Sequence, residues 1–371
     1  MGKIRVVVIG LGKRGKVHLA SLLKAGEYFE VVGICNRSSK CLEETAEAYG
    51  ISPDICYNDA GEMVKTVRPD AMVFVTMPDV RLSMIELAAK YNVKGVLFEK
   101  PMALSLEEAK KITDICTKNG IKSAVCHQHK YLRSFRLLDQ ALKSGELGNI
   151  YEIRAKCQAW ASQLGTHYID YMMWANGFSK PVAVVGHVHG SRMLADTHPS
   201  PDYMMAQIAF ENGVRGYIEC GYFSRPTTKH AVMPNIEGCA EFWTDSVLTV
   251  YGEYGYASAA CNGKFEKYTR ETAPCVSRVD YGGFGKHEEL LAQDQYTLDF
   301  GRWMRGEMDW HPCDVKLAYR GFEVLEGIYL SALDMKCVTL PLKGGLEEDC
   351  IERLKGVLTP CDYDYQIRHC E

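Results

Sequence analysis

The sequence predicts an α/β protein that opens with a doubly wound parallel sheet, and two observations support this. Over the first 125 residues, short apolar runs typical of strands buried on both faces alternate with helical patterns. The first run, Ile4–Ile9, leads into Gly10-x-Gly12-x-x-Gly15, and a helical pattern follows from Lys16 to Leu23. Strands that alternate with helices in this way form a parallel sheet with helices on both faces.

Each glycine of the opening loop has a physical role. The first allows a tight turn, the second lets a pyrophosphate approach the backbone, and the third lets the helix pack closely on the strand. The start of the helix then offers free N–H groups and a positive dipole end to the phosphates. We therefore expect a dinucleotide to contact Gly10, Gly12, Lys13, Arg14 and Gly15.

The second strand, Val31–Cys35, precedes Asn36, Arg37 and Ser38. An NAD site usually has an acidic residue here, which accepts hydrogen bonds from the ribose hydroxyls. Asn36 is neutral, and the cations Arg37 and Lys40 lie close by, so the loop tolerates a 2′-phosphate. Alternatively, Arg37 only stacks on adenine. The predicted cofactor is NAD(P), with a slight lean to NADP.

The remaining elements of the first domain follow the same alternation. A capping box, Ser105 with Glu108, marks the start of one helix. Since ligands of such sheets lie beyond the strand carboxyl ends, Thr76–Pro78, Glu99–Pro101 and His127–Gln128 are expected at one crevice. The predicted helices are Cys41–Tyr49, Ala60–Lys65, Val80–Tyr91 and Ser105–Asn119, and the predicted strands are Ala71–Val75, Gly95–Phe98 and Lys122–Val125.

Composition excludes several classes of protein. The length of 371 residues suits two domains, and a net charge of -4 without a basic block argues against a nucleic-acid partner. No apolar run is long enough to span a bilayer, and the chain enters a strand without a signal peptide, which predicts a cytoplasmic protein. The fifteen cysteines form no C-x-x-C pair, so we expect reduced thiols and no zinc site.

Several motifs in order resemble the glucose–fructose oxidoreductase / inositol dehydrogenase (Gfo/Idh/MocA) family of sugar dehydrogenases. The resemblance extends over nearly the whole chain and is specific for the family because of the order and spacing of its pieces. Those pieces are the glycine loop, Thr76-x-Pro78, Glu99-Lys100-Pro101, Gln128-x-Lys130-Tyr131, Ser144–Gly148, Gly165-Thr166-His167-x-x-Asp170, Phe210–Val214 and Val338–Leu342.

The resemblance implies a Rossmann domain, residues 1–125, followed by a substrate-binding and oligomerisation α/β domain, residues 126–371. The second domain would contain a large open, mainly antiparallel sheet with one face often buried between subunits, which implies a homo-oligomer, dimer or tetramer. A long helix is expected from Val315 to Leu333. The sequence independently shows strand-like runs at Ile150–Ala159, Pro181–His189, Met204–Phe210, Val214–Tyr222 and Phe242–Tyr251.

The implied activity is an NAD(P)-dependent oxidoreductase that moves a hydride between a nicotinamide and a hydroxyl, or its keto form, of a sugar, polyol or glycoside. Lys100 and His167 are the expected catalytic pair, with Asp170 beside them. The expected cofactor contacts include Thr76, Pro78, Glu99, Lys100 and Gln128. The expected substrate contacts are Lys100, Gln128, Tyr131, Trp160, Gln163, His167 and Asp170.

The helix predicted from Leu164 to Ala175 places His167, Asp170, Tyr171 and Trp174 on one face. Many family members have an aspartate four residues before this histidine, where the chain has Gln163, so the partner of His167 is open. His187 and His189 share a strand face, but no suitably spaced carboxylate completes a ligand set, so we expect no metal.

Two alternatives belong to other functional classes. One is an NAD-dependent glycosidase that acts through transient oxidation at C3. Such hydrolases carry a His-x-x-x-Tyr element, which we do not expect in the helix of His167. The other is a non-catalytic regulator that senses a dinucleotide or sugar, against which the presence of both Lys100 and His167 argues.

Overall fold

The computed structural model describes residues 2–196, 198–221, 246–281, 286–343 and 349–360. The chain forms two compact units. Unit 1 combines residues 1–131 with 290–319, and unit 2 combines residues 132–289 with 320–371. The chain therefore returns to unit 1 after most of unit 2 has been traced. The single boundary expected near residue 125 stays a prediction.

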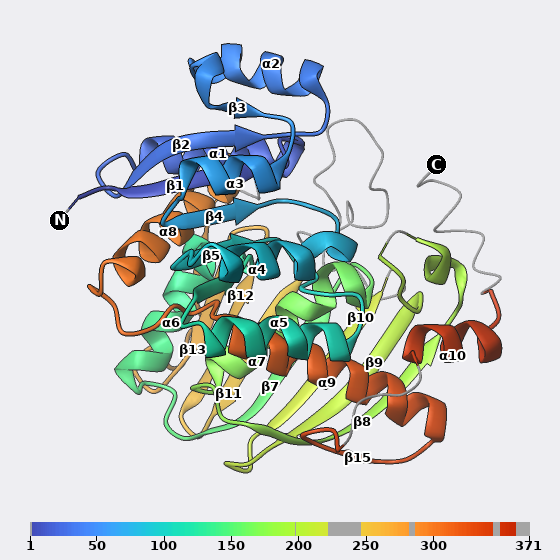
Figure 1. Cartoon of the computed structure of the whole chain (residues 1–371). Coiled ribbons are helices and arrows are strands. Elements are labelled where there is room, and N and C mark those ends of the chain that lie inside the picture. The colour runs from blue at the N-terminus through green and yellow to red at the C-terminus, as the bar shows by residue number, and fades with distance from the viewer. Residues whose placement is uncertain (1, 197, 222–245, 282–285, 344–348, 361–371) are drawn as a thin grey trace. The chain divides into compact units, whose positions relative to one another are not determined.

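Unit 1 contains a six-stranded parallel sheet with the strand order β3-β2-β1-β4-β5-β6 (Figure 1). The doubly wound fold predicted from the sequence is confirmed. The order reverses direction between β1 and β4, the point at which open sheets of this class bind ligands. The strands are β1 (Ile4–Ile9), β2 (Phe29–Cys35), β3 (Cys56–Tyr57), β4 (Ala71–Phe74), β5 (Gly95–Phe98) and β6 (Lys122–Val125).

The helices of the first 131 residues agree with the predicted ones, except that their ends shift by a few residues. Ser105 caps α5 as expected, because its Oγ accepts a hydrogen bond from the backbone N–H of Glu108 at 3.2 Å. Glu108 instead accepts a hydrogen bond from Leu104 N–H at 2.8 Å. The helices are α1 (Lys13–Lys24), α2 (Ser39–Tyr49), α3 (Ala60–Val67), α4 (Arg81–Lys90) and α5 (Leu106–Lys118).

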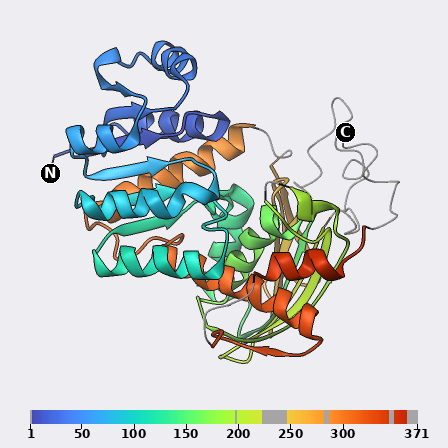
Figure 2. The same cartoon turned by 45° about the vertical axis from the view of Figure 1, so that its right-hand side comes forward.

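A late helix, α8 (Lys286–Met304), contributes its residues from Leu290 onward to unit 1. Figure 2 shows α8 in orange beside the dark blue α1. Asp294 on α8 accepts hydrogen bonds from Ser21 Oγ at 2.5 Å and from Lys24 Nζ at 2.8 Å. Phe300 stacks on Phe29 of β2 with a centroid separation of 6.3 Å.

Unit 2 contains a nine-stranded sheet with the order β14-β13-β12-β11-β7-β10-β9-β8-β15. All pairs are antiparallel except β7 with β10, which confirms the mainly antiparallel sheet. Residues 242–245 of the run expected from Phe242 lie outside the described residues. The strands are β7 (Ile150–Cys157), β8 (Pro181–His189), β9 (Tyr203–Phe210), β10 (Arg215–Gly221), β11 (Val247–Gly252), β12 (Gly255–Ala260), β13 (Lys264–Tyr268), β14 (Ser277–Asp280) and β15 (Val338–Thr339).

Helices pack on one face of this sheet. Met172 of α7 lies over β10, where a Cβ on Gly216 would come within 2.6 Å of the Met172 Cε atom. Ile328 of α9 lies over β8, where a Cβ on Gly186 would come within 2.5 Å of the Ile328 side chain. The helices of unit 2 are α6 (Arg133–Ser144), α7 (Thr166–Ala175), α9 (Val315–Asp334, begun in unit 1) and α10 (Cys350–Val357), and a π-helical turn, Ala161–Gly165, precedes α7.

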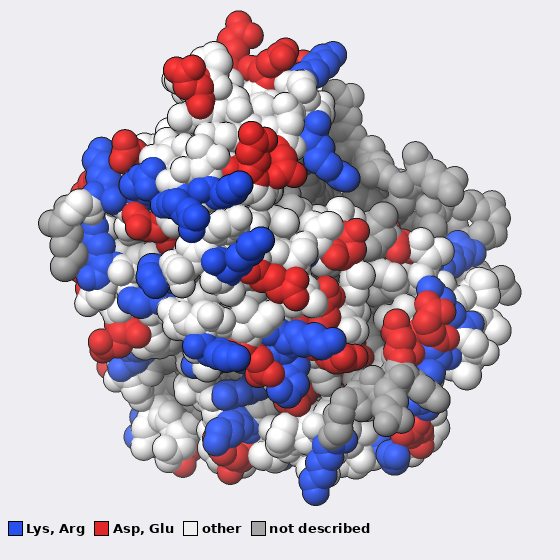
Figure 3. All heavy atoms as spheres, viewed as in Figure 1, with Lys and Arg blue, Asp and Glu red and all other residues white. Residues whose placement is uncertain are grey.

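The surface and the thiols agree with the composition. On the face drawn in Figure 3, Lys and Arg side chains alternate with Asp and Glu, so no large patch of one sign forms there. The twelve cysteines in the described part of the chain are all free thiols, and eight of them are buried. Among the described residues, no helix combines the length and apolar character that crossing a bilayer requires.

Candidate functional site

The glycine loop between β1 and α1 has the backbone that its sequence predicts. Gly10 adopts a φ of +87°, and a Cβ there would lie 2.4 Å from the carbonyl oxygen of Val75. A Cβ on Gly15 would lie 1.9 Å from the carbonyl oxygen of Gly10. Around Gly12, by contrast, no heavy atom lies within 4 Å of an added Cβ. Gly10 and Gly15 therefore serve the fold, whereas Gly12 keeps a space open beside the backbone.

The N-terminus of α1 is suited to an anion. Gly12 is the N-cap residue and offers no side chain to the free N–H groups of the first turn. That turn has no acidic residue and contains Lys13 and Arg14. The helix dipole and these cations therefore act in the same direction and favour a bound negative charge.

In the loop after β2, two of the three predicted residues hold neighbouring backbone groups. Asn36 Oδ1 accepts a hydrogen bond from Leu11 N–H at 3.1 Å, so this side chain fixes the glycine loop. Ser38 Oγ accepts from Cys41 N–H at 3.3 Å and thereby caps α2. Arg37 is exposed between them. Of the three, Arg37 is the side chain that can reach a ligand as a cation.

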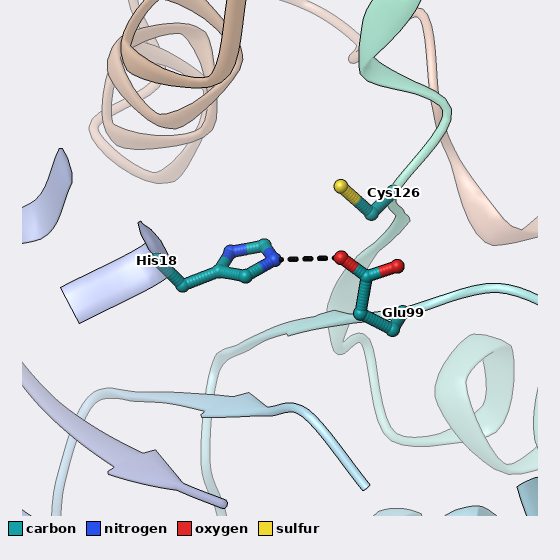
Figure 4. Close-up of side chains that lie close together, drawn as sticks. All are labelled: His18, Glu99 and Cys126. Atoms are coloured by element: carbon teal, nitrogen blue, oxygen red, sulfur yellow. Dashed lines mark hydrogen bonds and ion pairs between the residues drawn. The ribbon is translucent and has the colours of Figure 1, made fainter. Parts of the chain in front are cut away.

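Glu99 lies at the centre of a buried polar network that joins the end of β5 to α1 and α8. His18 Nε2 lies 3.0 Å from Glu99 Oε1 (Figure 4). Arg14 Nε donates to the same oxygen at 3.3 Å. Gln293 of α8 completes the network, since its Oε1 accepts from Arg14 Nη2 at 2.9 Å and its Nε2 lies 3.2 Å from His18 Nδ1.

The charges in this network follow from burial and pairing. Burial would raise the pKa of Glu99, but the hydrogen bond to His18 and the charges of Arg14 and Lys100 hold it well below its usual range. Burial lowers the pKa of His18, and the opposing effect of Glu99 does not overcome it. His18 is therefore a neutral ring that donates Nε2–H to an ionised Glu99 and accepts from Gln293 at Nδ1.

Cys126, which follows β6, lies next to this pair (Figure 4). The donor atoms of His18, Glu99 and Cys126 lie within 4.8 Å of one another, which is close enough for a shared metal ion. However, both ring nitrogens of His18 take part in hydrogen bonds, and burial raises the pKa of the Cys126 thiol well above its usual value. The cluster is thus arranged as a hydrogen-bond network with a protonated thiol, not as a set of free metal ligands.

Lys100 directly follows Glu99 and lies beside several charges. Burial lowers the pKa of Lys100, and the positive charges of Arg81 and Arg14 act in the same direction, while Glu99 opposes them. A lysine with a lowered pKa gives up its proton more readily than an ordinary lysine.

Arg81 is a residue that sequence reasoning missed. Its side chain is 2% exposed, and its Nη2 donates to the carbonyl oxygens of Thr76 at 2.9 Å and Lys100 at 3.2 Å. It thereby ties together the chain segments that follow β4 and β5. Burial lowers its pKa to about 10. The spacing of Arg81, Ile85 and Ala88, all buried on one face of α4, was the available signal.

The segment after β6 is buried as well. The side chain of Lys130 donates to the carbonyl oxygen of Pro312 at 2.6 Å. Tyr131 packs against Tyr296 with a centroid separation of 6.1 Å. Burial, with the charges of Arg14 and Lys100, lowers the pKa of the neighbouring His129 to about 3, so this ring is neutral. Gln128 is buried at the same strand end.

In unit 2, the expected substrate residues lie on α7 and the π-helical turn before it. His167, 3% exposed, has its Nδ1 atom 2.8 Å from the hydroxyl oxygen of Tyr171, one helical turn later. Asp170 and Trp160 are buried, and Gln163 is half-buried within the π-helical turn. π-helical turns inside helices occur often at functional sites.

The expectation that this helix lacks a His-x-x-x-Tyr element is wrong. His167 and Tyr171 have that spacing and are hydrogen-bonded. The i, i+4 spacing is visible in the sequence, which places Tyr171 on the same helix face as His167.

The predicted residues thus fall into two groups. Every predicted cofactor residue belongs to unit 1, where the parallel strands end at a common edge. Of the predicted substrate residues, Lys100, Gln128 and Tyr131 also belong to unit 1, whereas Trp160, Gln163, His167 and Asp170 belong to unit 2.

Comparison with known proteins identifies both halves of the chain. The family model described as "Oxidoreductase family, NAD-binding Rossmann fold" matches residues 4–127, and the "GFO/IDH/MocA C-terminal domain" matches residues 135–258. The chain is 24% identical over 213 residues to D-apiose dehydrogenase of Paraburkholderia graminis, which covers 53% of the chain and 55% of that relative. It is 27% identical over 204 residues to D-glucoside 3-dehydrogenase of Escherichia coli, covering 50% and 57%.

The chain therefore spans little more than half the length of these two curated relatives. Among solved structures, an oxidoreductase from Agrobacterium radiobacter in complex with NAD+, L-tartaric acid and magnesium superposes with a TM-score of 0.76. The two sequences are 16% identical, and the match covers 91% of this chain and 98% of the other. This likeness supports the two-part fold.

Proposed function

The chain belongs to the GFO/IDH/MocA family of oxidoreductases with an NAD-binding Rossmann fold, and from this we propose that it is a sugar dehydrogenase. It would transfer a hydride between a nicotinamide cofactor and a hydroxyl group, or the corresponding ketone, of a sugar, polyol or glycoside. The observation that carries this proposal is the combination of the open glycine loop with Lys100 at the end of β5 and His167 on α7.

The residues of unit 1 suit a dinucleotide. The space beside Gly12 and the uncapped N-terminus of α1 suit a pyrophosphate, and Lys13 adds a positive charge. Thr76, Pro78 and Gln128 follow strands at the same edge of the sheet. We propose that the protein binds NADP in preference to NAD. Position 36, where NAD sites usually have an acidic residue, is the neutral Asn36, and the neighbouring Arg37 is exposed.

The proposed division of work gives each catalytic residue one task. When bound, the nicotinamide supplies the hydride acceptor or donor. His167 takes the proton from the substrate hydroxyl, because a neutral imidazole offers a nitrogen lone pair that can accept it. Lys100 orients the same oxygen and stabilises its developing negative charge. Asp170, buried one residue before Tyr171, is proposed to support His167.

The test is a set of variants followed through cofactor absorbance with a panel of sugars. His167→Ala should lower kcat by roughly 10² to 10⁴ and leave cofactor affinity nearly unchanged. Lys100→Met should be comparably harmful, and Lys100→Arg should rescue little, because the planar guanidinium fork does not reproduce the compact point charge of the lysine ammonium group. If the acidic limb of the pH–rate profile persists in His167→Ala and vanishes in Lys100→Met, the two roles are exchanged.

A second candidate function is an NAD-dependent glycosidase that oxidises its substrate transiently at C3. The observation that favours it is the hydrogen bond between His167 and Tyr171, because relatives with this hydrolytic activity carry a His-x-x-x-Tyr element. Cleavage of a chromogenic glycoside without net cofactor reduction would establish the hydrolase. Cofactor and sugar binding without turnover of either kind would indicate the sensing regulator instead.

We also propose that the protein is a cytoplasmic homo-oligomer. Strands β8 and β9 of unit 2 pair in register, and each places an apolar side chain in solvent, Val185 and Met205, which are 40% and 47% exposed. Apolar groups on one sheet face favour association with a second copy. Light scattering that gave a mass near 41.6 kDa at micromolar concentration would contradict this.

A further inference from the structure

The hydroxyl group of Tyr171 is a hydrogen-bond partner of the His167 ring in unit 2. The 2.8 Å separation between His167 Nδ1 and Tyr171 Oη is that of a good hydrogen bond, and both side chains are buried. The two residues are one turn apart on α7, so the helix itself fixes the distance between their backbones.

Aromatic packing holds the tyrosine ring in place. The Tyr171 ring lies 5.3 Å from the ring of Phe135 on α6 and 5.3 Å from the ring of Tyr168, measured between centroids. Edge-on and tilted contacts of this kind restrict rotation of the ring. The hydroxyl oxygen is therefore a fixed point against which the imidazole of His167 is oriented.

The bond also bears on the chemistry of the other ring nitrogen. In a neutral imidazole one nitrogen carries the proton and the other has a lone pair. When Nδ1–H donates to the Tyr171 oxygen, the lone pair is on Nε2, which can then accept a proton from a hydroxyl group. The hydroxyl also accepts this hydrogen bond after Nε2 has been protonated, because the charged ring keeps its Nδ1–H.

We infer that Tyr171 is a positioning residue that fixes the ring orientation of His167 for proton transfer and accepts the Nδ1–H hydrogen bond when Nε2 acts as the base. This inference rests on the proposed function, in which His167 is the base. Upstream of the histidine the chain has the neutral amide of Gln163, and the hydrogen bond to Tyr171 orients the ring from the downstream side.

The experiment compares two buried tyrosines from the same aromatic group. Tyr171→Phe keeps the packed ring and removes the oxygen that faces His167. Tyr168→Phe is the matched control, since Tyr168 is equally buried and its hydroxyl lies 3.4 Å from the Cys261 thiol. Purified full-length variants are checked for unchanged thermal unfolding, and each is then assayed for turnover and examined by nitrogen-15 NMR of the histidine rings.

We expect Tyr171→Phe to lower kcat by about 10- to 150-fold, the loss of one hydrogen bond to a group that becomes charged. The KM and the cofactor Kd should change little, and the His167 ring nitrogens should show an altered tautomer balance. Tyr168→Phe should leave both kcat and the His167 signals unchanged.

An unchanged tautomer balance in Tyr171→Phe would overturn the inference, as would equal losses of kcat in both variants. The NMR readout uses the protein without substrate, so it tests the positioning role even if His167→Ala retains full turnover. That last result would instead refute the proposed role of His167 as the base.

Discussion

Replacement of Gly12 by valine separates cofactor binding from folding. Gly12 has φ -68° and ψ -171°, a backbone conformation open to any residue, and an added Cβ meets no heavy atom within 4 Å. The free energy of unfolding of the variant should therefore lie within about 1 kcal/mol of the parent's. Valine causes no backbone strain at this position, and it lowers the conformational entropy of the unfolded chain only slightly. Its side chain would occupy the space beside the α1 N-terminus.

The cost should appear in binding. A pyrophosphate at this helix start accepts charge-assisted hydrogen bonds worth about 1.5–3 kcal/mol each, so loss of one of them weakens binding by roughly 10- to 150-fold. Isothermal titration calorimetry with NAD and NADP measures this directly. Gly15→Ala is the contrasting variant, because its Cβ would lie 1.9 Å from the Gly10 carbonyl oxygen and must destabilise the fold itself.

The reasoning fails if Gly12→Val binds cofactor as tightly as the parent protein. It also fails if Gly12→Val and Gly15→Ala lower the thermal midpoint equally, because the structure gives only Gly15 a clash with the backbone.

Two further predictions follow from single side chains. Arg37→Ala should weaken the binding of NADP by roughly 1.5–3 kcal/mol and hardly change the binding of NAD, as measured by calorimetry. Equal losses for both cofactors would mean that Arg37 stacks on adenine. A parent protein that prefers NAD would refute the lean to NADP. Burial raises the pKa of Glu326 on α9 from 4.5 to about 7. Below pH 4.5 the carboxyl group is neutral in both the folded and the unfolded chain, and the free energy of unfolding is then at its highest with respect to this group. As the pH rises from 4.5 to 7 the unfolded chain ionises first, and about 3 kcal/mol of stability is lost. Glu326→Gln should remove this slope in thermal unfolding between pH 5 and 8; an unchanged slope would assign it to other groups.

The parts of the fold that the sequence predicted well are those with local causes. β1, the glycine loop and α1 were predictable because a buried strand, a positive φ and a close helix contact each demand particular residues. The Ser105 cap of α5 was predictable for the same reason. β3 contains only Cys56 and Tyr57, too few residues for a periodic pattern.

The parts that the sequence did not predict depend on contacts between distant segments. The pairing of Gln293 with His18 joins residues 275 positions apart, and neither residue carries a local sign of the other. The buried role of Arg81 depends on the carbonyl groups of Thr76 and Lys100, which are placed by two different strands. The same holds for most of the candidate site: its residue types were predictable, whereas hydrogen-bond partners from distant segments were not. The pair His167 and Tyr171 is an exception, because it has a local sign in its i, i+4 spacing.

The return of the chain to unit 1 has a consequence for protein synthesis. The 158 residues from Leu132 to Glu289 emerge from the ribosome before the unit 1 part of α8 is made. At about 5 to 20 residues per second, the nascent Rossmann sheet waits roughly 8 to 30 seconds for it. During that time Phe29 lacks the ring of Phe300, and His18 and Arg14 lack Gln293. The dinucleotide-binding half is thus synthesised first but completed late. A chaperone that shields apolar nascent segments would bind the surface that α8 later covers.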